Sequence, residues 1–105
     1  MPGNRYARRK DGNQNEGDKA GKDAGWVVTD ISFAGRGIPD SIWASACLPS
    51  PITILVEWKM PGEKLTESER KFHDSFPGAL IIANSGACAV TQAMEIRAQH
   101  LGVKP

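Results

Sequence analysis

Apolar and polar residues alternate through residues 52–59, a segment that is also rich in β-branched side chains. A two-residue period of this kind predicts a strand whose two faces carry different side chains. A second, shorter apolar segment, 41–46, lies just before it. The connection between the two contains Pro49 and Pro51, which cannot occupy a central strand, so we expect the two segments to pair as a β-hairpin.

The same kind of pattern predicts further strands over residues 26–33 and 79–83 and helices over residues 66–76 and 89–101. Thr66 is expected to cap its helix, in a capping box with Glu69. Phe72 and Phe76 follow one turn apart, and we expect them to face the core. Together these segments are expected to form an α/β domain around a small mixed sheet.

The hairpin geometry is expected to bring three polar side chains together. A symmetry centre between Leu48 and Pro49 sets Asp40 opposite Glu57, and directly opposed residues have Cβ atoms about 5 Å apart. Lys59 lies two residues beyond Glu57, so it projects from the same face about 7 Å away. Pro-Asp followed by Glu-x-Lys is therefore expected to form one cluster at the end of the hairpin.

Two carboxylates about 4 Å apart repel each other, at a cost of about 4 kcal/mol for an effective dielectric constant of about 20. A divalent cation would compensate, and oxygen ligands favour Mg²⁺ or Mn²⁺. Such an ion lowers the pKa of a water and polarises a phosphoryl oxygen, while Lys59 can orient or activate the water. Each half of the pattern also has an ordinary explanation, since Pro-Asp often begins a turn and Glu-Trp-Lys can end an exposed strand.

These segments resemble the VRR-NUC branch of the PD-(D/E)XK nucleases, in particular its small stand-alone versions from bacteriophages and bacteria. The resemblance runs from about Asn13 to Leu101 and rests on residues 35–40 (GRGIPD), 56–62 (VEWKMPG) and 65–73 (LTESERKFH). It implies a restriction-endonuclease-like, three-layer α/β core with a small mixed sheet flanked by helices. Residues 13–105 would form this single nuclease domain, with a first helix over residues 13–24.

The function that the resemblance implies is a structure-selective DNA endonuclease that depends on Mg²⁺ or Mn²⁺. Stand-alone members of the family act as homodimers on branched DNA such as Holliday junctions, and related domains cut flaps. On this basis we expect Asp40 and Glu57 to bind the metal, with the carbonyl of Trp58 completing the shell and Lys59 acting on the water.

Two more acidic residues match positions that the family uses. Glu16 corresponds to an acidic residue on the first helix near the metal, and is a possible catalytic helper. Glu69 corresponds to a polar active-site residue on the later helix, although its place in a capping box explains it equally well.

The expected first helix departs from the family pattern. Gly17 and Gly21 stand where family members usually carry bulky apolar residues, and each glycine weakens a helix by roughly 1 kcal/mol relative to alanine. A helix without an apolar stripe is poorly held unless a second subunit or DNA supports it. This departure motivates an alternative function, a catalytically weak or inactive DNA-binding accessory module of the same fold.

The net charge of the 105-residue chain is only +1, so its bulk charge does not announce a nucleic-acid-binding protein. Residues 1–12 are expected to be a disordered arm that either clamps phosphate or only solubilises the chain, with the basic residues Arg5, Arg8, Arg9 and Lys10. Further DNA contacts are expected from Arg36, on a glycine-flanked turn, and from Lys64 and Arg70, although such charges are often only solvated.

No segment is long and apolar enough to span a membrane, and the polar start has no apolar signal-peptide core. We therefore expect an intracellular protein, and the family resemblance implies the cytoplasm of a bacterial or phage-infected host cell. Cys47 and Cys88 are far apart and have no C-x-x-C partner, which indicates neither a zinc site nor a disulfide framework. No organic cofactor is expected.

Overall fold

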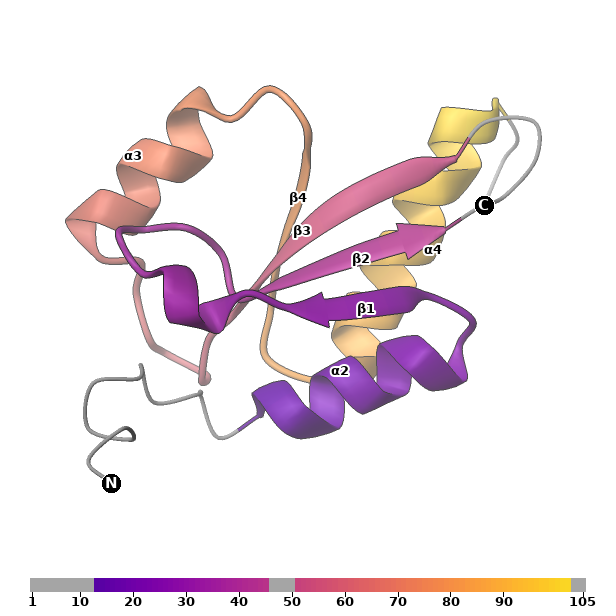
Figure 1. Ribbon diagram of the computed structural model, residues 1–105, viewed down its shortest axis with the longest axis horizontal. Helices are drawn as coiled ribbons and strands as arrows, with labels where there is room; N and C mark the ends of the chain where they lie inside the picture. The colour runs from indigo at the N-terminus through magenta and orange to yellow at the C-terminus, as the bar shows by residue number, and fades with distance from the viewer. Residues whose placement is uncertain (1–12, 46–50, 103–105) are drawn as a thin grey trace.

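Four strands form one mixed sheet in the computed structural model, which describes residues 13–45 and 51–102 (Figure 1). Across the sheet the strands are β1 (Val27–Asp30), β2 (Ser41–Ser45), β3 (Ile52–Trp58) and β4 (Ala79–Ala83). The helices are α2 (Gln14–Asp23), α3 (Glu67–Ser75) and α4 (Gly86–Leu101), with a 3₁₀ turn, η1 (Ser32–Ala34). β3 and β4 are parallel and the other neighbours antiparallel, so the expected α/β domain with a small mixed sheet is confirmed.

β2 and β3 form the expected hairpin in the expected register. Ser41 lies opposite Val56, and Ser45 lies opposite Ile52. Continued by one residue, this register sets Asp40 opposite Glu57. The connection that contains Cys47 and the basic N-terminal arm both lie outside the described residues.

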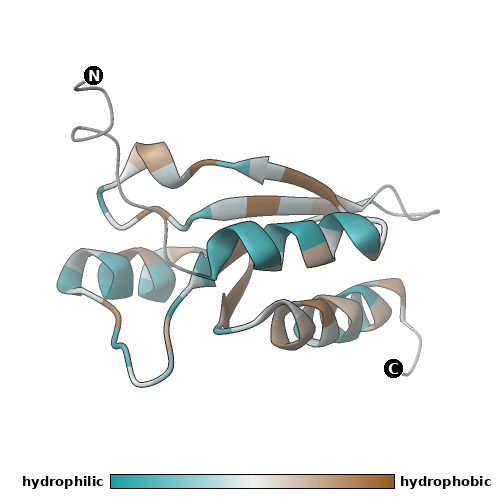
Figure 2. Cartoon of the chain, turned by 90° about the horizontal axis from the view of Figure 1, so that it is seen from below, coloured by the Kyte–Doolittle hydropathy of each residue, from teal (hydrophilic) through white to brown (hydrophobic). Residues whose placement is uncertain are grey.

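One face of the sheet carries the hydrophobic core and is covered by two helices, α2 and α4. Its buried side chains include Trp43, Ile54, Val56, Trp58 and Ile81. α4 packs on it through Ala89 and Ala93, both fully buried. Figure 2 shows that α4 is largely apolar, whereas α2, which covers the same face, is largely hydrophilic. α2 must therefore be held by something other than an apolar stripe.

Two glycines and two tryptophans hold α2. A Cβ added at Gly17 would collide with the six-membered ring of Trp58, and one added at Gly21 would lie 2.7 Å from the ring of Trp43. The glycines thus let both indoles lie directly against the helix backbone. The expectation of a poorly held helix was therefore wrong, because the apolar contribution to this contact comes from the strands.

A buried carboxylate completes the attachment of α2 to the sheet. Asp18 Oδ1 accepts hydrogen bonds from the indole nitrogens of Trp43, at 3.1 Å, and Trp58, at 3.3 Å. Its other oxygen accepts from the hydroxyl of Ser41 at 2.8 Å. Hydrogen bonds to a charged group are each worth about 1.5–3 kcal/mol. The three hydrogen bonds to Asp18 therefore help to hold α2 on the sheet in place of an apolar stripe on the helix.

The opposite face of the sheet is covered mainly at one end. The neighbouring side chains Ile42, Leu55 and Leu80 lie on this opposite face and are only half-buried. α3 reaches this face at the end where β3 carries Glu57 and where Lys59 follows the strand. Three layers are thus present at this end of the domain, the end that holds the predicted cluster.

Two local expectations were wrong. The first strand is shorter than residues 26–33, because Asp30 Oδ1 accepts from both the N–H and the hydroxyl of Ser32, which turns the chain into η1. Phe72 and Phe76 do not face the core. Their rings stack on each other with centroids 5.3 Å apart, and both side chains are half-buried. None of the helices in the described part of the chain is long and apolar enough to cross a membrane.

We predict that Gly17→Ala destabilises the protein although alanine favours helices. Overpacking against the Trp58 ring should cost about 1–3 kcal/mol and outweigh a helix gain of roughly 1 kcal/mol or less. Denaturant unfolding followed by circular dichroism measures the change. Lys22→Ala, on the exposed side of α2, is the control and should change stability by under about 0.5 kcal/mol. An equally stable Gly17→Ala variant would show that the helix backbone does not rest on Trp58.

Candidate active site

Asp40 lies just before β2 and is held by the backbone on both sides. Its carbonyl accepts from the N–H of Ile31 at 2.8 Å, and its own N–H donates to the carbonyl of Val56 at 3.0 Å. Its carboxylate Oδ2 accepts from the N–H of Trp58 at 2.8 Å. With only 3% of its surface exposed, the side chain is fixed toward the end of β3.

Glu57 is buried beside Asp40, and its protonation follows from that position. Only 1% of its surface is exposed. Burial raises the pKa of Glu57 to about 9, helped by the negative charges of Asp40 and Glu69 and opposed by Lys59. A hydrogen bond between the carboxyl groups of Glu57 and Asp40 acts in the same direction. At neutral pH, without a bound cation, Glu57 is therefore protonated while Asp40 accepts its hydrogen bond.

Lys59 is buried at the same end of the sheet and lies among three carboxyl groups. Its Nζ is 2.7 Å from Glu69, 3.6 Å from Glu63 and 3.9 Å from Glu57. Burial lowers the pKa of Lys59, but the hydrogen bond and charge of Glu69, with the charges of Glu57 and Glu63, outweigh it and leave the pKa raised. The lysine is therefore a fixed positive charge at neutral pH.

Glu69 caps α3 and also contacts Lys59. Its carboxylate accepts from the N–H of Thr66 at 2.8 Å, and Thr66 accepts from the N–H of Glu69 at 3.2 Å, so the capping box is confirmed. Burial opposes ionisation, but hydrogen bonds from Lys59 and Thr66 leave the pKa of Glu69 lowered. The same carboxylate therefore caps α3 and joins the helix to Lys59.

His73 belongs to this cluster although the sequence reasoning did not single it out. Its Nε2 lies 3.7 Å from Glu57 Oε1. Burial lowers the pKa of His73, although the charges of Glu69 and Asp74 oppose the shift, so the ring is neutral at pH 7. Residues four apart on a helix and two apart on a strand are both separated by about 6–7 Å. The pairing of Glu69 with Lys59 therefore predicts that His73 meets Glu57.

The start of α2 also reaches the site, but not through Glu16. The side chain of Glu16 is exposed and makes none of the contacts of the cluster described above. Instead, the amide of Asn13 donates to the carbonyl of Lys59 at 3.1 Å, and the buried amide of Gln14 lies 3.4 Å from the carbonyl of Asp40. The helix phase explains the difference, because the residues that hold α2 to the sheet point Glu16 away from it.

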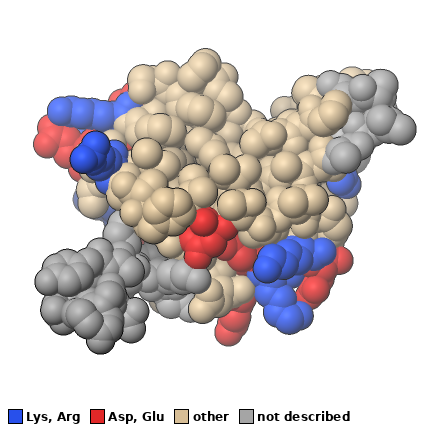
Figure 3. Space-filling view, in the orientation of Figure 1, with Lys and Arg blue, Asp and Glu red and all other residues tan. Residues whose placement is uncertain are grey.

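The predicted phosphate-binding residues lie at the surface. Arg36, Lys64 and Arg70 are exposed, and Arg36 has a positive φ of 59°. The turn that carries Arg36 packs closely on α3, since a Cβ at Gly37 would collide with the backbone of Ser68. Figure 3 shows Lys and Arg side chains in separate groups near α3 and near α2, interspersed with acidic ones. Arg8, Arg9 and Lys10 lie outside the described residues.

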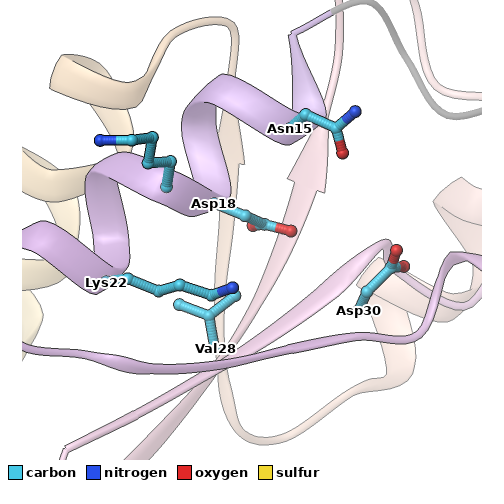
Figure 4. Close-up of a pocket in the computed structure, with 6 residues that line it drawn as sticks. Asn15, Asp18, Lys22, Val28 and Asp30 are labelled. Atoms are coloured by element: carbon cyan, nitrogen blue, oxygen red, sulfur yellow. The ribbon is translucent and has the colours of Figure 1, made fainter.

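A surface pocket lies on the other side of the sheet from this cluster, between α2 and β1 (Figure 4). It has a volume of about 340 Å³ and is lined by Asn15, Asp18, Lys19, Lys22, Val28 and Asp30. The carboxylates at its base have structural tasks, since Asp18 binds the two indoles and Asp30 caps the turn at Ser32. This pocket and the buried polar cluster are therefore different places.

The described residues contain no group of three or more His, Cys, Asp or Glu side chains that could hold a metal ion, so an ion in the cluster would also need other oxygen atoms. Glu57 Oε1 is buried and has no hydrogen-bond partner there. The N–H and C=O of one strand residue point the same way, so the carbonyl of Trp58 faces the side on which its N–H meets Asp40. Asp40, Glu57 and this carbonyl are therefore the oxygen atoms suited to hold an ion.

Comparison of the chain with protein-family models, curated proteins and solved structures gave no match. The functional interpretation therefore rests on the geometry and chemistry of the cluster.

The pKa of Glu57 gives a prediction for the cation-free protein. Between pH 4.5 and about 9 the folded state keeps a proton that the unfolded state has lost, so stability should fall as pH rises, by about 1 kcal/mol per pH unit. Glu57→Gln mimics the protonated side chain and should remove this slope. Its melting temperature in EDTA should match that of the wild type near pH 4.5 and exceed it by more than about 10 °C at pH 8.

Thermal unfolding of both proteins between pH 4.5 and 9 measures this difference. Glu63→Gln, which changes an exposed carboxylate next to the same lysine, is the control and should keep the wild-type slope. Parallel curves for the wild type and Glu57→Gln would mean that Glu57 is ionised in the folded protein.

Proposed function

We propose that this chain is a metal-dependent, structure-selective DNA endonuclease that hydrolyses phosphodiester bonds. The observation that carries the proposal is the convergence of Asp40, Glu57 and Lys59, all nearly fully buried, on one end of the sheet. A globular protein rarely places two carboxyl groups together with a lysine out of water unless the group has a task, and strongly perturbed pKa values mark such sites.

Each residue has a distinct role in the proposed reaction. Asp40, Glu57 and the carbonyl of Trp58 hold an Mg²⁺ or Mn²⁺ ion, which when bound activates a water and polarises the phosphoryl oxygen. Lys59, kept charged and in place by Glu69, orients the water or stabilises the negative charge that develops on the phosphate. Asn13 and Gln14 position the backbone of Lys59 and Asp40.

The proposal extends to the fold family and to the partners. The mixed sheet, with two helices on one face and α3 at the site end of the other, is compatible with a restriction-endonuclease-like core of the VRR-NUC type. Branched DNA would be contacted by Arg36, Lys64 and Arg70 around the site. A homodimer would cover the half-buried Ile42, Leu55 and Leu80, since exposed apolar patches commonly mark interfaces.

An accessory module that binds branched DNA without cutting it is the second candidate. It is favoured by Glu16, which does not join the cluster at the place where an acidic helper was expected. It is no longer favoured by Gly17 and Gly21, because these glycines hold α2 rather than loosen it.

We predict that the purified protein cuts four-way or flap DNA in Mg²⁺ or Mn²⁺, and that Asp40→Ala and Lys59→Ala each reduce the rate at least about 100-fold. Electrophoresis of labelled four-way, flap and linear substrates measures both the rate and the preferred structure. Lys19→Ala, a matched change at an exposed lysine of α2, should cut like the wild type.

Three results would contradict this assignment in different ways. Junction binding without cleavage would establish the accessory module. Cleavage that survives both Asp40→Ala and Lys59→Ala would place the activity elsewhere, most simply in a contaminant. An absence of both binding and cleavage would leave the cluster without a nucleic-acid function.

A further inference from the structure

Two buried polar atoms face each other beside the Asp40–Glu57 pair without bonding. Glu57 Oε1 and His73 Nε2 are 3.7 Å apart, and neither has a hydrogen-bond partner among the described residues. Hydrogen bonds between nitrogen and oxygen have lengths of about 2.7–3.2 Å, so this pair is too far apart for one. Buried polar atoms are nearly always satisfied in native proteins, so this pair is a candidate position for a bound ion or water.

The surrounding side chains do not supply a partner for either atom. Lys59 binds Glu69 at 2.7 Å and stays 3.9 Å from Glu57, on the side of Oε2 rather than Oε1. Phe72 presents an aromatic ring edge-on to His73, which offers no hydrogen-bonding partner. The gap between Glu57 Oε1 and His73 Nε2 is therefore bordered by two buried atoms, each of a type that can bind a cation.

We propose, on the basis of the nuclease function above, that His73 Nε2 and Glu57 Oε1 are ligands of the same divalent cation. We further propose that this nitrogen ligand makes the site prefer transition-metal cations, for example Co²⁺, to Mg²⁺.

The separation of the two atoms suits a shared ion. Imidazole nitrogen and carboxylate oxygen each bind such cations at about 2.0–2.2 Å, which sets neighbouring ligands about 3.0–3.4 Å apart. The observed 3.7 Å needs to close by only a few tenths of an ångström. Mg²⁺ prefers oxygen ligands, whereas imidazole suits transition metals, and affinity rises along the series from Mn²⁺ to Co²⁺, Ni²⁺ and Cu²⁺.

The fold keeps His73 in position for this role. It lies one turn after Glu69 on α3, and the helix is fixed at its start by the capping box and along this face by the bond from Glu69 to Lys59. Two residues of α3 therefore lie against the end of β3. Glu69 is bonded to Lys59 at 2.7 Å, whereas His73 and Glu57 are 3.7 Å apart and not bonded. A cation between His73 and Glu57 would complete the attachment of the helix.

The experiment compares Co²⁺ and Mg²⁺ binding to the wild type, His73→Leu and His100→Gln by calorimetry. The chain has two histidines, and His100, exposed near the end of α4, is the matched control. We expect the wild type to bind Co²⁺ at least about tenfold more tightly than Mg²⁺. His73→Leu should lose at least about tenfold in Co²⁺ affinity and less than about twofold in Mg²⁺ affinity, whereas His100→Gln should change neither.

A second measurement keeps His73 intact and so does not depend on the folding of His73→Leu. In His100→Gln, labelled with ¹⁵N-histidine, the imidazole signals come from His73 alone, and Zn²⁺ serves as a diamagnetic probe. Addition of Zn²⁺ should shift the Nε2 resonance of His73 and leave its Nδ1 as the protonated nitrogen. An Nε2 resonance that does not move at saturating Zn²⁺ would overturn the proposal.

The outcomes separate this inference from the proposed function. Binding of both ions that requires Asp40 but is unchanged in His73→Leu would refute the histidine ligand and leave the nuclease site standing. Equal losses of Co²⁺ and Mg²⁺ affinity in His73→Leu would refute the selectivity. If the wild type binds neither ion, the metal-dependent function and the histidine ligand fail together.

Discussion

The placement of Trp58 links the core of this domain to its polar cluster. Its indole lies against the backbone of α2 at Gly17 and donates to the buried carboxylate of Asp18. Its backbone N–H donates to Asp40, and its neighbours in the chain are Glu57 and Lys59. Because side chains alternate along a strand, a tryptophan fixed in the core forces both neighbours onto the opposite face. The core contact therefore sets the direction of the site residues.

Part of the negative charge at that end of the sheet is offset without a cation. Glu57 carries a proton, the positive charge of Lys59 lies beside Glu63 and Glu69, and the carboxylates of Asp40 and Glu69 are each bound by hydrogen bonds. Loss of the Glu57 proton would add an uncompensated buried charge, which is costly. Under the proposed function, a divalent cation would take the place of this proton, since metal binding and deprotonation of its ligands are coupled.

The sequence was sufficient to predict features that depend on local spacing. The hairpin register followed from two prolines and a symmetry centre, and the structure confirms it at Ser41 and Val56. The capping box at Thr66 was likewise readable from residue types at fixed offsets. Both depend on interactions within a few residues or across one turn, where backbone geometry leaves few alternatives.

Features that depend on contacts between distant segments were predicted less well. The rotation of α2 about its axis is set by Trp43 and Trp58, which lie on strands far along the chain. The helix sequence alone does not show this rotation, which brings Asn13 and Gln14, rather than the expected Glu16, to the cluster. His73 was missed because its partner is on another element. The distance from Glu69 to His73 along the helix matches the distance from Lys59 to Glu57 along the strand. This match predicts the contact of His73 with Glu57 only after the contact of Glu69 with Lys59 is known.

The glycines of α2 show how small residues within a helix can be misread as a weak point of the fold. A core can be filled by bulky residues on a helix and small residues on a strand, or by small residues on the helix and bulky residues on the strand. Both arrangements work because packing depends on total volume and shape. Here the volume is on the strands, in Trp43 and Trp58, and the helix supplies Gly17 and Gly21. The exchange also gives the helix two indole N–H donors to bind, and Asp18 binds both. A helix seated in this way has a fixed rotation and a fixed distance from the sheet. Its first residues can therefore hold the backbone of Asp40 and Lys59 in place without contributing an acidic side chain of their own.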